Sequence, residues 1–220
     1  MVVVALNLKT YPESFQSKSL DLLKAVCGQD TSHHLIVCPS LLDSAWMASV
    51  FEKTPRVSLF AQHADANGFG AHTGSLPWEA LHQIGFEGTL LNHSERKITH
   101  EKILKTVEAS EKSGFKVIVC ADSIDEAKKM SAIGPWAVAI EPPELIGSGI
   151  SVSKAKPDVV RDGVKAIKKV NQKVLALVGA GVSNREDFQT SLKLGAEGVL
   201  LASAFVKAKD PKKWLEEFLS

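Results

Sequence analysis

The sequence lacks a charge imbalance and long apolar runs, and it contains few cysteines. Its 26 basic and 25 acidic residues give a formal net charge of +1 over 220 residues. No basic block or stripe stands out, which argues against nucleic acid and anionic membranes as main partners. Cys27, Cys38 and Cys120 have no metal-type spacing, and their odd number favours a reducing compartment over a disulfide framework. We therefore predict a cytoplasmic protein.

No segment of the chain has the pattern of a targeting sequence or a membrane span. The apolar run at residues 2–8 follows no basic region and is far too short to cross a bilayer, so we interpret it as a strand. No linker, low-complexity tract or charge block marks a boundary, and hydrophobic residues make up 45% of the sequence. One domain over residues 1–220, with a sizeable core, is expected.

Short runs of almost purely apolar residues recur along the chain, with little alternation between apolar and polar positions. Val, Ile and Leu dominate them, which is typical of parallel strands that are buried on both faces. The eight predicted strands cover residues 2–8, 35–38, 57–61, 89–91, 116–120, 137–140, 174–178 and 199–201.

Helical periodicity lies between these runs. Leu42, Ala45, Trp46 and Val50 form one apolar stripe. The other predicted helical segments are 103–107 after the N-cap Thr99, 160–170, a helix after the N-cap Asn184, and 214–219 after Pro211 at a first helical position.

Eight strands that each precede a helix predict a single closed (β/α)8 TIM barrel. An open doubly wound sheet is the alternative, but no Gly-x-Gly-x-x-Gly motif follows the first strand. The connection 62–75 has no periodicity and contains three glycines together with Phe69 and two histidines. Because long irregular loops are usually functional, we expect this one to dock on a neighbouring subunit.

Active sites of such barrels form where the strands end, so polar residues at strand exits are the candidates. Asn7 and Lys9 end the first strand and project to the same side, His93 follows the fourth strand, and Glu141 follows the sixth. Each has a structural alternative. Lys9 could be an ordinary lysine at a strand end, with its charge in water. His93 could be a hydrogen-bonded interior histidine, and Glu141 could be a solvated residue of a surface turn.

Other polar residues carry weaker signals. Glu95 and Arg96 also fit an exposed ion pair. We interpret Cys120 as a wall of the core or site rather than a nucleophile, because no base is paired with it. His33 and His34 precede the second strand and receive no role.

The segment from Glu141 to Gly149 begins with two prolines and ends in Gly-Ser-Gly. A stiff entry and a pliable end predict a segment that moves as a unit and excludes water from the carboxylate. Together with Gly179-Ala180-Gly181, these glycines would offer backbone N–H groups to a phosphate. One carboxylate, one imidazole and one lysine, without a cluster of metal ligands, suit proton abstraction next to a carbonyl.

Taken together, these motifs resemble the triosephosphate isomerase family, and its compact archaeal-type branch in particular. The resemblance covers residues 2 to 209, with four motifs in the family's order at strands one, four, six and seven. Residues 61–62 and 71–74 are similar to its intersubunit loop. The matching motifs are Asn7-x-Lys9, His93-Ser94-Glu95-Arg96, Glu141-Pro142 and Gly179-Ala180-Gly181.

The resemblance implies interconversion of dihydroxyacetone phosphate and D-glyceraldehyde 3-phosphate through an enediolate, without cofactor or metal. It implies that Glu141 takes the carbon proton, that neutral His93 polarises the carbonyl, that Lys9 stabilises negative charge, that Asn7 helps bind the carbonyl side, and that Glu95 supports the site beside His93. It assigns phosphate binding to Ile146, Gly147, Gly181, Ala202 and Ser203. Burial is expected to raise the pKa of Glu141, and a helix start after His93 to disfavour imidazolium.

The chain departs from the family pattern at three places. Ala202-Ser203-Ala204 stands where many members have a Gly-Gly pair, Val178 replaces a tyrosine that latches the lid in many members, and the lid entry Pro142-Pro143-Glu144 also differs. The shortened helices argue against a family-like dimer as the final state, and the resemblance to the compact branch implies a homotetramer.

Two other functional classes are open. A Schiff-base aldolase would need a strand lysine, and residues 136–140 contain none. A barrel that binds metabolites without turnover would not need Asn7, Lys9, His93 and Glu141 together.

Overall fold

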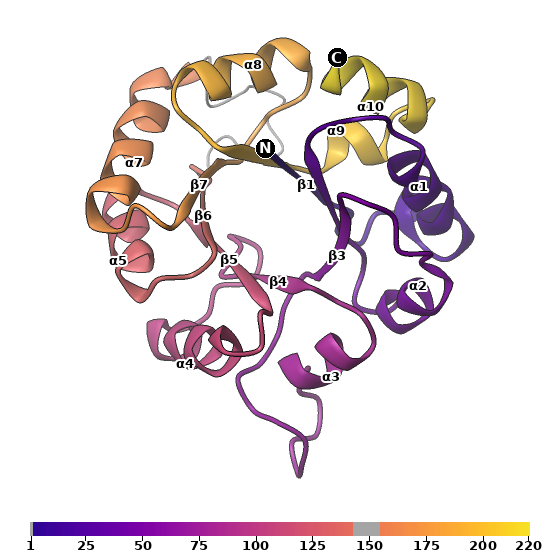
Figure 1. The fold of residues 1–220 in the computed structure, drawn as a ribbon, viewed down its shortest axis with the longest axis horizontal. Helices are drawn as coiled ribbons and strands as arrows, with labels where there is room; N and C mark the ends of the chain where they lie inside the picture. The colour runs from indigo at the N-terminus through magenta and orange to yellow at the C-terminus, as the bar shows by residue number, and fades with distance from the viewer. Residues whose placement is uncertain (1, 143–154) are drawn as a thin grey trace.

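The computed structural model describes residues 2–142 and 155–220. Eight parallel strands pair in chain order, and β8 pairs with β1 to close the barrel (Figure 1). Every predicted strand is confirmed, with ends that differ by one residue at most. The strands are β1 Val3–Asn7, β2 His34–Cys38, β3 Val57–Ala61, β4 Gly88–Leu91, β5 Lys116–Ala121, β6 Ala137–Ile140, β7 Leu175–Val178 and β8 Gly198–Leu201.

Helices surround the ring of strands (Figure 1). They are α1 Ser17–Cys27, α2 Ser44–Val50, α3 Trp78–Gln83, α4 His100–Glu111, α5 Ile124–Ile133, α7 Pro157–Val170, α8 Arg185–Lys193, α9 Ser203–Val206 and α10 Pro211–Leu219, with a 3-10 turn η1 at Pro12–Ser14. Among these helices, none is long and apolar enough to cross a membrane.

The predicted helix starts are confirmed by hydrogen bonds. The Thr99 side chain accepts the N–H of Lys102 at the start of α4, and Asn184 accepts the N–H of Asp187 at the start of α8. Pro211 occupies the first turn of α10. Each cap satisfies a backbone donor that the helix leaves unpaired.

The helix predicted at α2 is confirmed, but its predicted apolar stripe is wrong, because all four residues of that stripe are exposed. The helix forms, but Leu42 is 82% exposed, Trp46 40% and Val50 37%, and it is Met47 that is fully buried. A seven-residue helix has too few turns to bury a whole stripe, so one side chain anchors α2 and the others remain at the surface.

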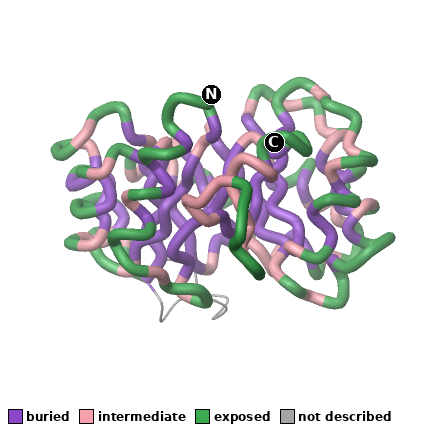
Figure 2. The backbone as a smooth tube through the Cα atoms, turned by 90° about the horizontal axis from the view of Figure 1, so that it is seen from below, coloured by how far each residue is buried: buried purple, intermediate pink, exposed green. Residues whose placement is uncertain are grey.

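The core has an inner and an outer part, because successive strand residues point to opposite faces. Inside the barrel, Ala5, Ile118, Ala139 and Leu200 belong to one buried cluster. Their neighbours along the strands pack outward against the helices, and Figure 2 shows the buried strands at the centre with exposed residues at the rim. The inner cluster fills the barrel, so functional groups are confined to its two ends.

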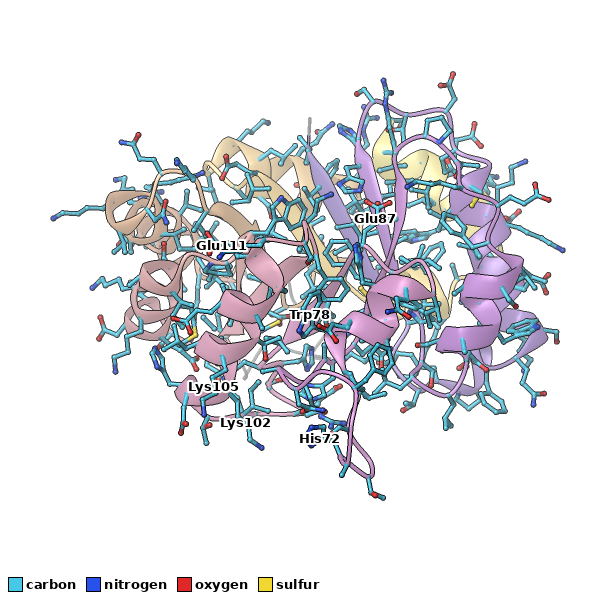
Figure 3. The ribbon with its side chains drawn as sticks, turned by 60° about the horizontal axis from the view of Figure 1, so that its bottom comes forward. His72, Trp78, Glu87, Lys102, Lys105 and Glu111 are labelled. Carbon is cyan, nitrogen blue, oxygen red and sulfur yellow. The ribbon has the colours of Figure 1, made fainter. Side chains whose placement is uncertain are left out.

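The loop between β3 and α3 is irregular, as predicted, apart from an isolated bridge between Asp65 and Pro77. It projects away from the barrel (Figure 1), and Figure 3 shows His72 near its outer part. Phe69 in this loop is 61% exposed.

Candidate active site

The carboxyl ends of the strands bring most of the predicted site residues to one hollow. Glu95 lines an adjoining hollow, which shares Asn7, Lys9 and His93 with the first. Ile146 and Gly147 lie outside the described residues. The first hollow is lined by Asn7, Lys9, Tyr11, His93, Glu141, residues 180–183 and residues 200–204, which include Gly181, Ala202 and Ser203.

Lys9 is held in an uncommon backbone conformation with φ of 50°. Its N–H donates to Asn7 Oδ1 at 3.1 Å, and Gln62 Nε2 donates to its carbonyl at 3.1 Å. Gln62 also donates to the carbonyl of Cys38 at 3.1 Å, which ties the first strand end to the second. These bonds over-determine the turn, as a strained residue requires.

The Lys9 ammonium points into the mouth of the barrel rather than into bulk water. Its Nζ lies 2.6 Å from Glu95 Oε1, and the Lys9 side chain is only 14% exposed while that of Glu95 is 57% exposed. The structural alternative of a strand-end lysine with its charge in water therefore does not describe Lys9. Glu95 holds the cation in place from the solvent side.

His93 is buried and hydrogen-bonded through its Nδ1 atom. The N–H of Glu95 donates to Nδ1 at 3.2 Å. Nδ1 is the hydrogen-bond acceptor in this contact, which leaves Nε2 as the ring nitrogen that can donate to a ligand. The Glu95 carboxylate also lies 3.7 Å from Nδ1, but this longer contact does not displace the backbone donor.

The predicted role of a helix start beside His93 is wrong. The first regular helix after it, α4, begins at His100, seven residues later. The group that reaches the ring is the N–H of Glu95, in the tight turn whose Arg96 N–H donates to the His93 carbonyl at 2.7 Å. The group in contact with the ring is therefore a backbone N–H of a local turn and not the end of a helix.

Glu141 is 4% exposed. Burial raises the pKa of Glu141, while His93, Cys120 and Lys9 oppose part of that shift. Its Oε2 atom is buried and has no hydrogen-bond partner among the residues the structure describes. A carboxylate oxygen without a donor is poorly stabilised, which makes it a stronger base than a solvated one.

Glycine at position 179 leaves the space that the Glu141 side chain occupies. A Cβ atom at Gly179 would collide with Glu141 Cγ and Oε1. The glycine run after β7 was predicted to take part in phosphate binding. The close approach of Glu141 gives a separate, steric reason for a glycine at position 179. Ala180 and Gly181 follow with φ of 67° and 72°, so the chain bends around the hollow.

The base and the imidazole face each other. Glu141 Oε2 lies 3.9 Å from His93 Nε2, too far for a hydrogen bond and close enough for both to reach adjacent atoms of one small molecule. The arrangement supplies a proton acceptor, an N–H donor and a cation at one mouth. It can remove a proton from carbon and stabilise the oxygen anion that results.

Three residues of the site region carry no signal that sequence reasoning used. Tyr11 and Ser183 line the hollow, and the ring of Tyr11 lies 4.4 Å from Lys207 Nζ. Gln62 was noted only as part of a loop motif, yet it braces Lys9. Its position at the exit of β3 was the available clue, since every strand exit was a candidate place.

Across residues 2–142 and 155–220, no group of three or more His, Cys, Asp or Glu side chains is arranged to hold a metal ion. His33 and His34 lie at the start of β2, at the end of the barrel opposite the hollow. Cys120 is fully buried, and its thiol is hydrogen-bonded to Glu141. Cys120 belongs to the buried cluster inside the barrel and is not among the residues that line the two hollows, so it is a residue of the core rather than of the site wall.

Comparisons with known proteins agree along the whole chain. A family model described as triosephosphate isomerase matches residues 2–218. A triosephosphate isomerase of Archaeoglobus fulgidus is 42% identical over 221 residues, covering 100% of this chain and 97% of the relative. Those of Methanosarcina mazei and Methanocaldococcus jannaschii are 41% and 38% identical, covering 98% and 99% of this chain and 96% and 99% of the relatives. The likeness therefore extends well beyond the site motifs.

Proposed function

Because the chain belongs to the triosephosphate isomerase family, whose members are isomerases, we propose that it interconverts dihydroxyacetone phosphate and D-glyceraldehyde 3-phosphate. The observation that carries the proposal is the buried Oε2 atom of Glu141, which has no hydrogen-bond partner among residues 2–142 and 155–220 and lies 3.9 Å from Nε2 of His93. A raised carboxylate pKa beside an N–H donor matches the needs of a carbon acid next to a carbonyl. This fold and family also appear in general accounts of such pKa tuning.

In the proposed reaction, Glu141 removes the proton from the carbon that carries the hydroxyl group. The C–H electron pair forms the double bond of an enediolate, and the former carbonyl oxygen gains the negative charge. His93 Nε2–H donates its proton to that oxygen and takes the proton of the neighbouring hydroxyl. Glu141 then returns its proton to the adjacent carbon, so the atoms balance without a cofactor.

Lys9, Asn7 and Glu95 have supporting roles in this proposal. The Lys9 ammonium stabilises the developing oxyanion and attracts the phosphorylated substrate. The Asn7 side chain fixes the turn that presents Lys9, since its Oδ1 accepts the N–H of that residue. Glu95 holds both the Lys9 ammonium and, through its own N–H, the His93 ring.

Phosphate binding is proposed for backbone N–H groups at the ends of β7 and β8. Gly181, Ala202 and Ser203 border the same hollow as His93 and Glu141. The resemblance adds Ile146 and Gly147 of the lid. A cradle of N–H groups suits this chain, because its net charge of +1 offers little general attraction for an anion.

The test is a coupled assay of the purified protein with D-glyceraldehyde 3-phosphate, repeated in heavy water. Proton transfer through an enediolate predicts turnover together with deuterium incorporation at carbon. Glu141→Asp, which withdraws the carboxylate by one methylene, should lower kcat by about 100-fold. A wild-type protein without turnover would refute the proposed function, and an unimpaired Glu141→Asp variant would refute the assignment of the base.

We further propose one domain over residues 1–220 that assembles as a homo-oligomer, with a tetramer favoured over a dimer. The exposed apolar side chains of Leu42, Trp46 and Phe69 support association. Light scattering over a range of concentrations tests it, with Phe69→Asp expected to lower the oligomer mass and Ile84→Asp as an exposed apolar control. A fully active monomer would contradict the docking of the loop. The cytoplasmic location remains a prediction.

A further inference from the structure

The end of β4 breaks the alternation that a strand imposes. Leu90 belongs to the cluster inside the barrel, and Leu91 packs in the outer cluster. In a continued strand, residue 92 would face inward and residue 93 outward. Instead His93 lines the hollow, while Asn92 lines neither of the two hollows at this mouth. The reversal occurs at Asn92, whose φ is 58°.

A left-handed residue other than glycine needs support from its surroundings, even though asparagine tolerates this region better than most residues. Asn92 is 3% exposed, and its side chain is hydrogen-bonded at both ends. Nδ2 donates to the Cys120 carbonyl at 3.0 Å and to Glu126 Oε1 at 3.0 Å, while Oδ1 accepts the N–H of Ile98 at 3.3 Å. These three bonds fix the conformation that turns His93 inward.

Glu126 is the side chain that holds Asn92 from another part of the chain, beside the backbone carbonyl of Cys120. Ser123 and Glu126 have the spacing of a capping box, in which the glutamate reaches back to the N–H of the N-cap residue. Ser123 does accept the N–H of Glu126 at 3.2 Å. The Glu126 carboxylate, however, is directed to the N–H of Asp122 through Oε2 at 2.6 Å and to Asn92 through Oε1. Helix capping alone does not account for this bridge.

The Glu126 carboxylate is kept charged. Burial alone would raise its pKa, but the bonds from Asp122 and Asn92 and the charge of Lys97 outweigh burial, so the pKa of Glu126 is lowered. Lys97 Nζ lies 3.3 Å from Glu126 Oε2 and 2.7 Å from Asp122 Oδ2. A charged acceptor gives Asn92 Nδ2 a stronger bond than a neutral one would.

The segments that carry His93 and Glu141 are both hydrogen-bonded to backbone carbonyls at the end of β5. Asn92 donates to the carbonyl of Cys120, and the N–H of Glu141 donates to the carbonyl of Ala121 at 2.9 Å. A shift of Asn92 relative to β5 therefore moves His93 relative to Glu141, the distance on which the proton transfers depend.

We propose that Glu126, acting through Asn92, is a positioning residue that holds the His93 imidazole in register with Glu141. The inference rests on the proposed function, since it concerns the same proton transfers. It predicts a loss confined to the chemical step, because neither Glu126 nor Asn92 borders the space where the substrate would bind.

The test compares Glu126→Gln with Asp125→Asn in steady-state assays. Both remove one negative charge from the first turn of α5, but the Asp125 side chain is 83% exposed and pairs with Lys128. Glu126→Gln should lower kcat by about 10- to 100-fold with KM nearly unchanged, because a small misplacement of a reacting group has effects of that size. Asp125→Asn should leave both constants unchanged.

A double-mutant cycle with Asn92→Gly tests whether Glu126 acts on His93 through Asn92. Glycine keeps the left-handed backbone but removes the side-chain bonds, so this variant should fold and lose kcat to a similar extent. If Glu126 acts through Asn92, adding Glu126→Gln to Asn92→Gly should change kcat less than about twofold. The imidazole N–H resonance of His93 should shift in Glu126→Gln and not in Asp125→Asn.

The outcomes separate the two proposals. Absence of turnover in the wild type would refute the function. An active wild type with a Glu126→Gln variant of equal kcat would refute the positioning role, and so would losses that multiply in the double variant. A lower melting temperature with unchanged kcat and an unchanged His93 resonance would make Glu126 a purely structural residue.

Discussion

The two ends of the barrel contain the same kinds of side chain in opposite circumstances. At the amino end, His34, Glu87 and Lys116 lie near the starts of β2, β4 and β5. At the carboxyl end stand His93, Glu141 and Lys9. Figure 3 shows Glu87 at one end and His72, in the loop after β3, towards the other. Residue type therefore does not distinguish a reactive end from an inert one.

The difference lies in how completely each group is paired. His34 Nε2 lies 2.9 Å from Ser58 Oγ, Ser58 also bonds to Glu87, and Lys53 and Lys116 each lie 3.6 Å from that carboxylate. Although burial alone would raise it, the pKa of Glu87 is lowered, because Ser58 and the lysines outweigh burial. In the described part of the chain Glu141 has no such donor at Oε2, and its pKa is raised. Incomplete pairing at one end leaves reactivity there.

The sharpest test of this comparison removes the charge from each carboxylate in turn. Glu141→Gln should lower kcat by about 100- to 10,000-fold, the contribution of a positioned general base. Glu87→Gln should leave kcat within about twofold, since its carboxylate lies at the far end of a filled barrel. Steady-state assays of both proteins under the same conditions decide it. Comparable losses would show that the two ends are coupled and that the contrast is wrong.

The two buried histidines provide a second, smaller contrast. His93→Gln should lower kcat by about 100-fold, because an amide is a poorer proton donor than the neutral imidazole it replaces. His34→Gln should keep kcat and cost about 1 kcal/mol of unfolding free energy through its lost bond to Ser58. Activity assays and urea titrations measure the two quantities. A His34→Gln protein that is stable but inactive would overturn the assignment.

Two glycines extend the contrast to packing. Gly179→Ala should lower kcat by about 10- to 100-fold, because the new methyl group would collide with Glu141 and displace its carboxylate. Gly88→Ala would instead collide with Phe60 and the Lys116 carbonyl, and should cost about 1–3 kcal/mol of stability with normal kcat in the folded fraction. Melting curves and assays on the same samples separate these effects; a normal kcat for Gly179→Ala would exclude its role beside Glu141.

The sequence predicted the barrel because its strands are buried on both faces and so appear as apolar runs, and because caps such as Thr99 carry local signals. It also placed Glu141, Lys9 and His93 at one mouth, since parallel strands all end on the same side. Burial of α2 could not be predicted in this way: whether Leu42 faces the core depends on how a short helix packs, not on its own periodicity.

Side-chain hydrogen bonds between segments distant in the sequence could not be predicted either. Nothing near Asn92 indicates that Glu126 holds it, and nothing near Lys9 indicates the brace from Gln62. A neutral His93 was predicted from a helix start directly after it, but that helix begins only at His100. Spacing along the chain predicts which groups reach a strand end, whereas their protonation depends on donors that only the folded chain brings together.

The smallest expected effect is on stability. Near neutral pH, Glu141→Gln and Glu87→Gln should change the free energy of unfolding in opposite directions. The pKa of Glu141 is raised above its ordinary value of 4.5 on folding, so its favourable contribution is complete below that value and is lost as the pH rises through the raised pKa. Glu141→Gln should therefore be more stable than wild type by about 1 kcal/mol near neutral pH, the size of gain common at strained active sites.

Glu87 has a lowered pKa, so its contribution is complete above 4.5 and is lost as the pH falls through the lowered value. Glu87→Gln should be less stable than wild type near neutral pH, with the difference fading in acid. Melting temperatures of the three proteins at about pH 4 and about pH 7 test both signs. If Glu141→Gln were the less stable protein near neutrality, Glu141 would be a satisfied core carboxylate, and the unpaired oxygen beside His93 would no longer support its role as the base.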